Sequence, residues 1–296
     1  MTAGIAVLGS VAMLGLFADL LASGTPIVRH SERGLEVLPI HSLGDEEPTA
    51  TELWAFCRYG PRSETRGILE TASLAHPLGT DERGRDVFAR LVHGARVALL
   101  TGFAVVLIGA VGGVVAGGLA GGFGKRYGRA LDRLAQSVDV FPAIIVVALF
   151  RAVEGQSSAL SAIVGASLVQ WATVARLVRS EVQRLTAEDF ALASRALGAS
   201  RAQVLLRHVL PHLGPALASS AALGLSAVVV LEATLSFLDL GAPITGASWG
   251  EMLAEGARNP AHTGLFWAPA LLLSLTVGSA YLVAEAIRSV SDPRAG

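Results

Sequence analysis

Two stretches of this sequence are long, apolar and free of charge, and they decide what kind of molecule the chain can form. Val97 to Gly124 and Gly155 to Ala175 contain no Asp, Glu, Lys or Arg. A helix needs about 20 mostly apolar residues to cross the roughly 30 Å of hydrocarbon in a bilayer. Stretches of this length and composition therefore predict membrane-spanning helices.

Four further windows extend this pattern to six predicted spans. They are Met1–Leu21, interrupted only by Asp19; Leu134–Phe150, which reaches span length only by including Asp139; Leu213–Leu231; and Asn259–Ala284. A secretory signal peptide is the alternative for the first window, but that window has no Lys or Arg at its start and no small-residue cleavage pattern at its end. The expected fold is an all-α polytopic membrane protein.

The composition excludes several other classes of protein. Of the 296 residues, 52% are hydrophobic and only 16% are charged, and the mean hydropathy is +0.55. Soluble domains are about a quarter charged, so a soluble enzyme is not expected. The 23 basic and 24 acidic residues leave a net charge of −1, which gives no support for a nucleic-acid partner. Cys57 is the single cysteine, so neither an internal disulfide nor a cysteine metal cage is possible.

The distribution of Lys and Arg predicts how the chain is oriented. Cytoplasmic loops of membrane proteins are rich in these residues. Basic side chains crowd the connection after the second span, the connection after the fourth span and the C-terminal tail, whereas the opposite short loops hold only Arg151 and Arg258. Both termini are therefore expected in the cytoplasm of a bacterium, with the chain in its inner membrane.

These expectations divide the chain into consecutive parts. Residues 1–23 would form the first transmembrane helix and residues 24–90 an extracytoplasmic segment with an acidic cluster at Asp45–Glu47. Residues 91–290 would form a five-helix core with a cytoplasmic loop at 180–212, and residues 291–296 a cytoplasmic tail. Pro142 is expected to kink or begin the third span.

Glycine recurs every fourth residue in the second span, at Gly109, Gly113, Gly117 and Gly121. Residues four apart share one face of a helix, so this face is bare backbone that lets a neighbouring helix approach closely. The neighbour is either another helix of the same chain or a second subunit. In both cases this face contacts protein rather than lipid.

The connection after the fourth span, residues 180–212, is expected to form two short helices. Thr186 can cap a helix entering at Ala187 to Asp189, and Ser200 can cap a second helix that runs to Pro211. Gly198 between them suits a turn with positive φ. Phe190, Ala193 and Leu197 are spaced to share one apolar face, and such a stripe packs back on the protein or inserts into a partner's groove.

The run Ala193-Ser194-Arg195-Ala196-Leu197-Gly198-Ala199-Ser200, followed by Leu210-Pro211, resembles the EAA loop of binding-protein-dependent ABC importer permeases. In that family the loop docks into a groove of the cytoplasmic ATPase subunit. Leu192 stands where the family typically has Glu, and Ser194 replaces the second Ala. The resemblance therefore implies contact with an ATPase without implying a salt bridge from that Glu. The residues it assigns to this contact are Phe190, Ala193, Ser194, Arg195, Leu197, Gly198, Ala199 and Pro211.

Three more segments resemble the dipeptide, oligopeptide and nickel branch of the family, and its second permease subunit in particular. They are His76–Leu99, the run Glu232–Gly241 with the Ser248-Trp249-Gly250 that follows it, and the closing Ser291-Asp292-Pro293-Arg294. The resemblance covers roughly residues 74–294. It implies the type I importer permease fold and a chain that forms half of a translocation pathway for di- or oligopeptides. Nickel or another small solute is the alternative.

The resemblance also implies a set of partners. These are a homologous second permease, two cytoplasmic ATP-binding subunits, an extracytoplasmic solute-binding protein and the membrane lipid. No cofactor is expected on this chain and no catalytic residue, since ATP would be bound by the partner subunits. In agreement, the Lys125 that follows Gly124 lacks phosphate-loop spacing: Leu119 stands at the required glycine, and Arg126 at the required Ser or Thr.

Glu232 is the most unusual single charge, because it lies late in the fifth span, where an ionisable side chain is costly. It either lines the translocation pathway near the outer gate or pairs with a polar group of a neighbouring helix. No metal site is expected, since Pro211 interrupts the His208–His212 pair. A secondary transporter or a non-transporting scaffold would also fit the composition, but the chain shows no internal repeat and almost no midplane charges.

Overall fold

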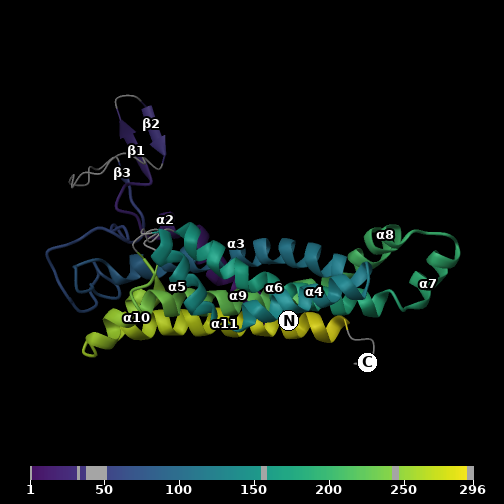
Figure 1. Cartoon of the computed structure of the whole chain (residues 1–296). Helices are drawn as coiled ribbons and strands as arrows, with labels where there is room; N and C mark the ends of the chain where they lie inside the picture. Colours follow the sequence, from purple (N-terminus) through teal and green to yellow (C-terminus); the bar gives the residue numbers. More distant parts are fainter. Residues whose placement is uncertain (1, 32–33, 38–51, 155–158, 242–246, 292–296) are drawn as a thin grey trace. The chain divides into compact units, whose positions relative to one another are not determined.

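The computed structural model describes residues 2–31, 34–37, 52–154, 159–241 and 247–291, and most of these residues are helical (Figure 1). The acidic cluster Asp45–Glu47 and the closing Asp292–Arg294 lie outside the described residues. The long helices are α3 (Val87–Gly122), α4 (Lys125–Asp139), α6 (Ala159–Leu185), α9 (Gly214–Phe237) and α11 (Thr263–Ser291). The shorter helices are α1 (Thr2–Leu16), α2 (Ala18–Leu21), α5 (Ala143–Glu154), α7 (Asp189–Ala196), α8 (Arg201–Val204) and α10 (Trp249–Arg258).

The chain forms two compact units, and neither is a consecutive stretch of sequence. One unit comprises Met1–Ile5, Thr101–Leu231 and Val277–Gly296. The other comprises Ala6–Leu100 and Glu232–Thr276. We call them the coupling unit and the outer unit, because the first contains the 180–212 connection and the second contains the predicted extracytoplasmic segment.

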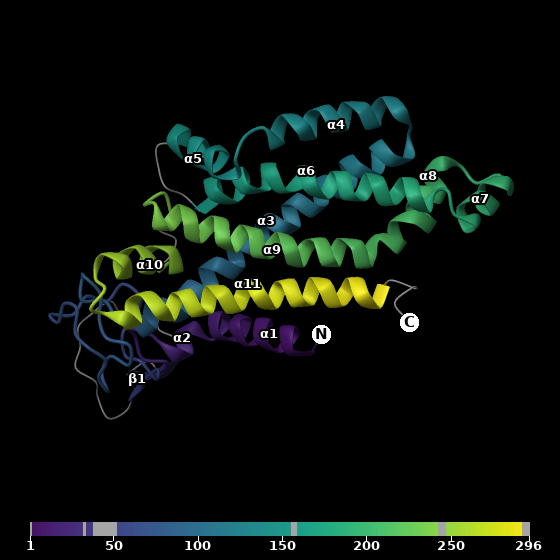
Figure 2. The same ribbon diagram turned by 90° about the horizontal axis from the view of Figure 1, so that it is seen from below.

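Helix α4 of the coupling unit is strongly amphipathic and packs along α6 (Figure 2). Leu131 and Ala135 are buried, and Leu131 shares an apolar cluster with Ala120 of α3 and Ala175 of α6. An ion pair between Asp132 and Arg179 ties the same two helices together. The opposite face is exposed, and it carries three basic side chains, Arg126, Arg129 and Arg133.

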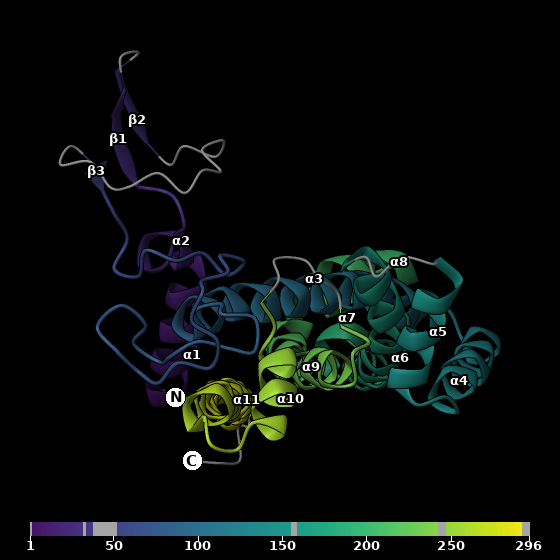
Figure 3. The same cartoon turned by 90° about the vertical axis from the view of Figure 1, so that its left-hand side faces the viewer.

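The outer unit contains a small antiparallel sheet, which is the exception to the expected all-α fold (Figure 3). Strand β1 (Val28–Ser31) lies between β2 (Gly34–Val37) and β3 (Glu52–Leu53). Val28 pairs with Val37 on one side and with Leu53 on the other. β-Branched residues are common in strands, so this valine pairing suits the sheet. The sheet belongs to the predicted extracytoplasmic segment, residues 24–90.

Within the described ranges, three helical stretches are long and apolar enough to cross a membrane: Val87–Gly122, Arg201–Phe237 and Thr263–Ser291. They hold all of the fifth predicted span and most of the second and sixth, which confirms a multi-pass membrane protein. The first predicted span is apolar but short, since α1 has 15 residues. Helix α6, over the fourth predicted span, has 27 residues but is not among the three, and its start adjoins residues outside the described ranges.

The third predicted span is not a single helix. The chain bends by 77° between Arg126–Val138 and Ala143–Phe150, and the two pieces together are long and apolar enough for one broken span. Pro142 directly precedes α5, as expected of a residue that begins a helix but cannot continue one. The third predicted span is therefore broken near Pro142, which confirms that this residue interrupts one helix and precedes the next.

Candidate functional site

The connection after α6 forms a short helix-turn-helix at the C-terminal end of α6 (Figure 1). Gly198 lies in the turn between α7 and α8 with φ of +93°, a conformation that side chains other than glycine rarely adopt. Ser200 then caps α8: its Oγ accepts from the backbone N–H of Gln203 at 3.2 Å, and its own N–H donates to Gln203 Oε1 at 2.9 Å. This capping box satisfies two backbone donors, and it confirms the predicted turn and cap.

The predicted N-terminal cap of α7 was wrong. Thr186 does not cap it, because its hydroxyl donates to the carbonyl oxygen of Gln183 instead. Helix α7 begins at Asp189, after an N-cap position at Glu188 whose side chain makes no capping hydrogen bond. Asp189 in the first turn is still favourably placed, because the N-terminal end of a helix carries partial positive charge.

The predicted end of the second helix at Pro211 was also wrong. After α8 the chain continues through a π-helical segment, η1 (Leu205–Val209), and a 3₁₀ segment, η2 (Leu210–Leu213), directly into α9. Proline lacks an N–H, and its ring collides with the carbonyl four residues earlier in a regular α-helix. One wide turn followed by one tight turn lets the chain pass Pro211 without ending the helical path, so α8 and α9 are mechanically continuous.

The apolar stripe of α7 faces solvent. Leu197 is 90% exposed and Phe190 is 38% exposed, and Ala193 is exposed between them. The buried residue of α7 is Ala191, on another face of the helix. The ring of Phe190 stacks on His212, with the ring centroids 5.3 Å apart. The stripe is thus open to solvent in the single chain, and its contact with a partner stays a prediction. Of the other predicted contact residues, Arg195, Gly198 and Pro211 are exposed and Ser194 and Ala199 are half-buried.

The helix-turn-helix is anchored to the spans by an apolar cluster. Its members come from α6, α7, α8 and the start of α9: Val174, Val178, Val182, Leu185, Ala191, Val204, Leu205, Val209 and Leu213. All are nearly inaccessible to solvent. Protein interiors are close-packed and transmit displacement, so a force applied to α7 and α8 reaches α6 and α9.

A cavity of about 820 Å³ lies among α6, α9 and α11 of the coupling unit. At one end its lining is charged, with Glu181 and Arg184 at the end of α6 and Arg288 near the end of α11. Glu181 and Arg184 pair with each other at 2.9 Å. The rest of the lining is neutral: Gln170, Thr173, Leu177, Pro215, Ala216, Ser219, Ser220, Leu223, Gly224 and Ala227, besides His212 and Ser291 near the charged end.

The predicted glycine stripe of α3 lies against α6 of the same chain. A Cβ at Gly113 would lie 2.5 Å from Val174 Cβ, and one at Gly117 would lie 2.4 Å from the carbonyl oxygen of Ala175. A Cβ at Gly109 would lie 2.7 Å from Gln170 Cγ, and one at Gly121 would lie 2.8 Å from Val182 Cβ. Atoms this close leave no room for any side chain. Of the two predicted roles, these contacts correspond to packing inside one subunit.

Glu232 is half-buried and held by hydroxyl groups. Its Oε1 accepts from Ser236 Oγ at 2.8 Å, one turn along α9, and from Ser248 Oγ at 2.9 Å, just before α10. Ser248 also caps α10 by accepting from the backbone N–H of Gly250. These bonds are the kind expected of a structural polar contact. The pathway role of Glu232 stays a prediction.

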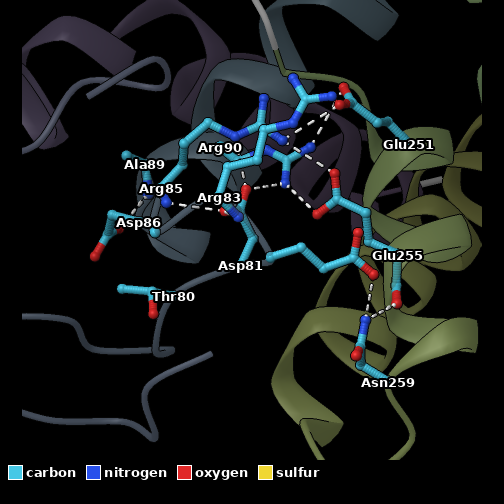
Figure 4. A network of polar contacts seen from close by, with 12 residues as sticks. Thr80, Asp81, Arg83, Arg85, Asp86, Ala89, Arg90, Glu251, Glu255 and Asn259 are labelled. Carbon is cyan, nitrogen blue, oxygen red and sulfur yellow. Dashed lines mark hydrogen bonds and ion pairs between the residues drawn. The ribbon is translucent and has the colours of Figure 1, made fainter. Parts of the chain in front are cut away.

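The outer unit contains a buried ion network that was not predicted from the sequence (Figure 4). Arg90 of α3 is fully buried and pairs with Asp81 and, at 2.7 Å, with Glu255 of α10. Arg85 adds pairs to Asp81 at 2.7 Å and to Glu255 at 3.0 Å. Glu251 lies 3.3 Å from both guanidinium groups. Three carboxylates and two guanidinium groups leave this site with one excess negative charge.

A sequence signal for this network exists in retrospect. Asp81 and Arg85 are four residues apart, and so are Glu251 and Glu255, which places the two glutamates on one face of α10. Opposite charges in these two short segments suggest pairing, but nothing in the sequence says that segments 170 residues apart meet. In the described residues, His, Cys, Asp and Glu form no group of three suited to a metal ion.

Comparisons with known proteins agree with this geometry. Residues 113–296 match the family described as binding-protein-dependent transport system inner membrane component. The chain is 31% identical over 225 residues to the oligopeptide transport system permease protein OppC of Bacillus subtilis, covering 75% of this chain and 73% of that protein. It is 35% identical, at the same coverage, to the glutathione transport system permease protein GsiD of Escherichia coli O157:H7.

A solved structure supports the fold. An inward-facing structure of the MetNI methionine ABC transporter matches with a TM-score of 0.57 over 68% of this chain and 96% of the matched chain. The sequences are 22% identical, so this likeness concerns the fold alone. The expected type I importer permease fold is confirmed.

Proposed function

The chain belongs to the binding-protein-dependent permeases of ABC importers, in their peptide branch, and from this premise we propose that it forms half of a translocation pathway for di- or oligopeptides. The energy comes from ATP hydrolysed by separate subunits, and this chain carries no cofactor and no catalytic residue of its own. Two relatives named for oligopeptide and glutathione transport support peptides as the solute class.

One observation carries the proposal: the same two helices hold the coupling segment and line the cavity. Helix α6 leads into α7, and α8 leads into α9 without a break in the helical path. Both α6 and α9 line the cavity of about 820 Å³. A movement of α7 and α8 therefore changes the shape of the space through which a solute passes.

The helix-turn-helix acts as a rigid lever. ATP binding favours the closed arrangement of the two ATPase subunits, and this differential affinity supplies the free energy for the change of state. The apolar cluster under α7 and α8 transmits the displacement to α6 and α9, which tilt and alternate the access of the cavity. This chain contributes geometry and stiffness, and no step of the chemistry.

The exposed stripe on α7 is the surface that we assign to the ATPase. An amphipathic helix that shows Phe190, Ala193 and Leu197 to water suits an apolar groove on a partner, because burying them there removes apolar area from water. The turn at Gly198 and the capping box at Ser200 hold this helix in one orientation. Each of two permeases would present one such helix to one of two ATPase subunits.

The basic face of α4 supports a second permease. This helix follows the second predicted span and packs on α6, and Arg126, Arg129 and Arg133, which the distribution of basic residues places on the cytoplasmic side, share its exposed face. Arginine side chains are costly in hydrocarbon and face water-filled paths or protein partners instead. We therefore assign this face to the aqueous side of the pathway and to the homologous permease that completes it.

The outer unit would receive the solute from an extracytoplasmic binding protein, over residues 24–90 and 238–264. This arrangement follows the orientation expected from the basic residues, with both termini and the helix-turn-helix in the cytoplasm. The membrane is the bacterial inner membrane, in keeping with the family description.

Purification of the tagged chain in a mild detergent tests the proposal. We expect an ATP-binding subunit and a second, homologous permease to purify with it, in comparable amounts. A tagged Ala193→Glu variant is the control, since it should lose the ATP-binding subunit and keep the second permease. Purified chain that transports peptide without any ATP-binding subunit would overturn the proposal.

A further inference from the structure

Resting on the pathway proposed above, we infer that the side-chain amide of Gln170 hydrogen-bonds the backbone of a passing peptide within the cavity. This amide gives the pathway a specific contact group for the solute and accounts for tolerance toward peptides of different charge.

Gln170 occupies a notch made by two glycines of the coupling unit. A Cβ at Gly109 of α3 would lie 2.7 Å from Gln170 Cγ, and a Cβ at Gly224 of α9 would lie 2.3 Å from its Nε2. Any side chain at either position would displace the glutamine. The notch holds the aliphatic part of Gln170 against α3, while its amide lies against α9, where Gln170 and Gly224 both line the cavity.

The amide of Gln170 has no partner among the described residues, although it lies within a predicted membrane span, five residues before the end of that span at Ala175. Thr173 and Ser220, which also line the cavity, make no side-chain hydrogen bond to a described residue either. Polar groups in a membrane protein are ordinarily paired, because hydrocarbon cannot satisfy them. Unpaired donors and acceptors around one cavity indicate that their partners are water and a transient solute.

The charged and neutral parts of the lining are separated along the helix axis. Gln170 precedes Glu181 by eleven residues of α6, which is about 17 Å at 1.5 Å per residue. The charged end, with Glu181, Arg184 and Arg288, thus lies near the predicted cytoplasmic mouth. The part that a solute meets inside the membrane presents an amide, hydroxyl groups and apolar surface.

This chemistry suits the one feature that all peptides share. A glutamine amide offers two N–H donors and a carbonyl acceptor, which match the backbone C=O and N–H of any peptide. It carries no net charge, so it neither attracts nor repels the side chains of the solute. A carboxylate at the same point would act strongly on a charged solute, because Coulomb energies are large where the dielectric constant is low.

The substitution Gln170→Glu tests the inference, since it keeps the size of the side chain and adds a charge. The complete importer is reconstituted in liposomes with its binding protein, and initial uptake is measured for three tripeptides whose central residue is Glu, Ala or Lys. We expect the Glu-to-Lys uptake ratio to fall by at least about tenfold relative to wild type. Gln170→Leu should slow all three peptides together and leave the ratio unchanged.

Gln183→Glu is the matched control, because it adds the same charge to an exposed position of α6 that does not line the cavity. It should leave the ratio as in wild type. An unchanged ratio in an active Gln170→Glu importer would overturn the inference. If that variant does not assemble, Ser220→Asp places a carboxylate in the same cavity and must lower the ratio. Failure of wild-type importer to take up any peptide would instead count against the proposed function.

Discussion

Arg90 and Glu255 lie 165 residues apart in the sequence, yet Arg90 Nη1 donates to Glu255 Oε2 at 2.7 Å with both side chains almost inaccessible to solvent. This contact fixes α10, on the outer connection between α9 and α11, to the start of α3. Because Asp81, Arg85 and Glu251 belong to the same site, the two charges cannot be exchanged for neutral groups with equal effect.

Removing Arg90 should be much more harmful than neutralising Glu255. Arg90→Met leaves three carboxylates with only Arg85, and breaking a buried pair in this way costs about 3–5 kcal/mol of stability. Glu255→Gln removes the excess negative charge and should cost clearly less. Thermal unfolding of the purified complex measures both effects. Arg258→Gln is the control, because its pair with Glu82 is solvent-exposed and worth about 0–1 kcal/mol. Equal losses for Arg90→Met and Glu255→Gln would contradict the excess charge.

The same site predicts a dependence on pH. Burial raises the pKa of Glu255 above its ordinary value of 4.5. The folded chain therefore binds more protons than the unfolded chain between pH 4.5 and the raised pKa, and stability falls as the pH rises through that range. Relative to the Glu255→Gln variant, which lacks this titrating group, the wild-type complex should therefore be more stable in mild acid than at neutral pH. The difference in melting temperature between the two proteins, followed from pH 5 upward, checks the sign.

Cys57 should be silent toward thiol reagents in the folded protein. It is the only cysteine, it is 2% exposed, and burial raises the pKa of its thiol to about 12. Maleimides react with the thiolate, so we expect no labelling at pH 7.5 until the chain is denatured. Rapid labelling of native protein would show that this part of the outer unit opens.

The silent Cys57 makes single-cysteine mapping of the orientation possible. Leu74 is fully exposed in the outer unit, and Ala187 is exposed in the turn before α7. A membrane-impermeant maleimide added to intact cells should label Leu74→Cys and not Ala187→Cys. Permeabilised cells should show labelling of both. The reverse pattern would place the helix-turn-helix outside and remove its contact with a cytoplasmic ATPase.

The glycine stripe should tolerate no methyl group on the face toward α6. A Cβ at Gly113 would lie 2.5 Å from Val174 Cβ, whereas one at Gly112 has only an ordinary contact of 3.5 Å. Gly113→Ala should destabilise the protein by about 1–3 kcal/mol through overpacking. Gly112→Ala should be neutral or stabilising, because alanine favours helix more than glycine does. Unfolding in detergent compares the two, and equal behaviour would argue against tight packing of α3 on α6.

The stripe on α7 predicts a loss of coupling. Ala193→Glu places a charge in the face that we assign to the ATPase groove, so uptake should fall at least tenfold while the protein still inserts in the membrane. Leu192→Glu is the control, since it adds the same side chain one residue away, outside the stripe, where the EAA loop typically has Glu. Undiminished uptake by Ala193→Glu would remove the assignment of this face.

The sequence predicted the helices that depend on local composition. Charge-free windows located the cores of α3, α9 and α11, because hydrocarbon excludes charge over the whole length of a span. The windows placed the ends of helices wrongly where polar and charged side chains are paired inside the protein. Helix α3 begins at Val87, ten residues before its charge-free window, because Arg90 is paired and His93 Nε2 bonds with the carbonyl oxygen of Ala22.

The site was predictable only in part, for a similar reason. Gly198 and Ser200 act through their own backbone and nearest neighbours, so their roles could be predicted from local sequence. The π-helical passage of Pro211, the notch around Gln170 and the ion network depend on residues that are distant in the chain. Their positions follow from the packing of whole helices, which no short motif encodes.

Energised uptake by the complete importer is the most direct test of the proposed function. Proteoliposomes containing this chain, its second permease and the ATP-binding subunits, with binding protein outside, are supplied with a labelled peptide and with ATP inside. We expect accumulation above the external peptide concentration, abolished when ATP is omitted or the binding protein is left out. Uptake that continues without ATP, or that is driven by an ion gradient, would contradict the assignment of this chain as a permease of an ATP-driven importer.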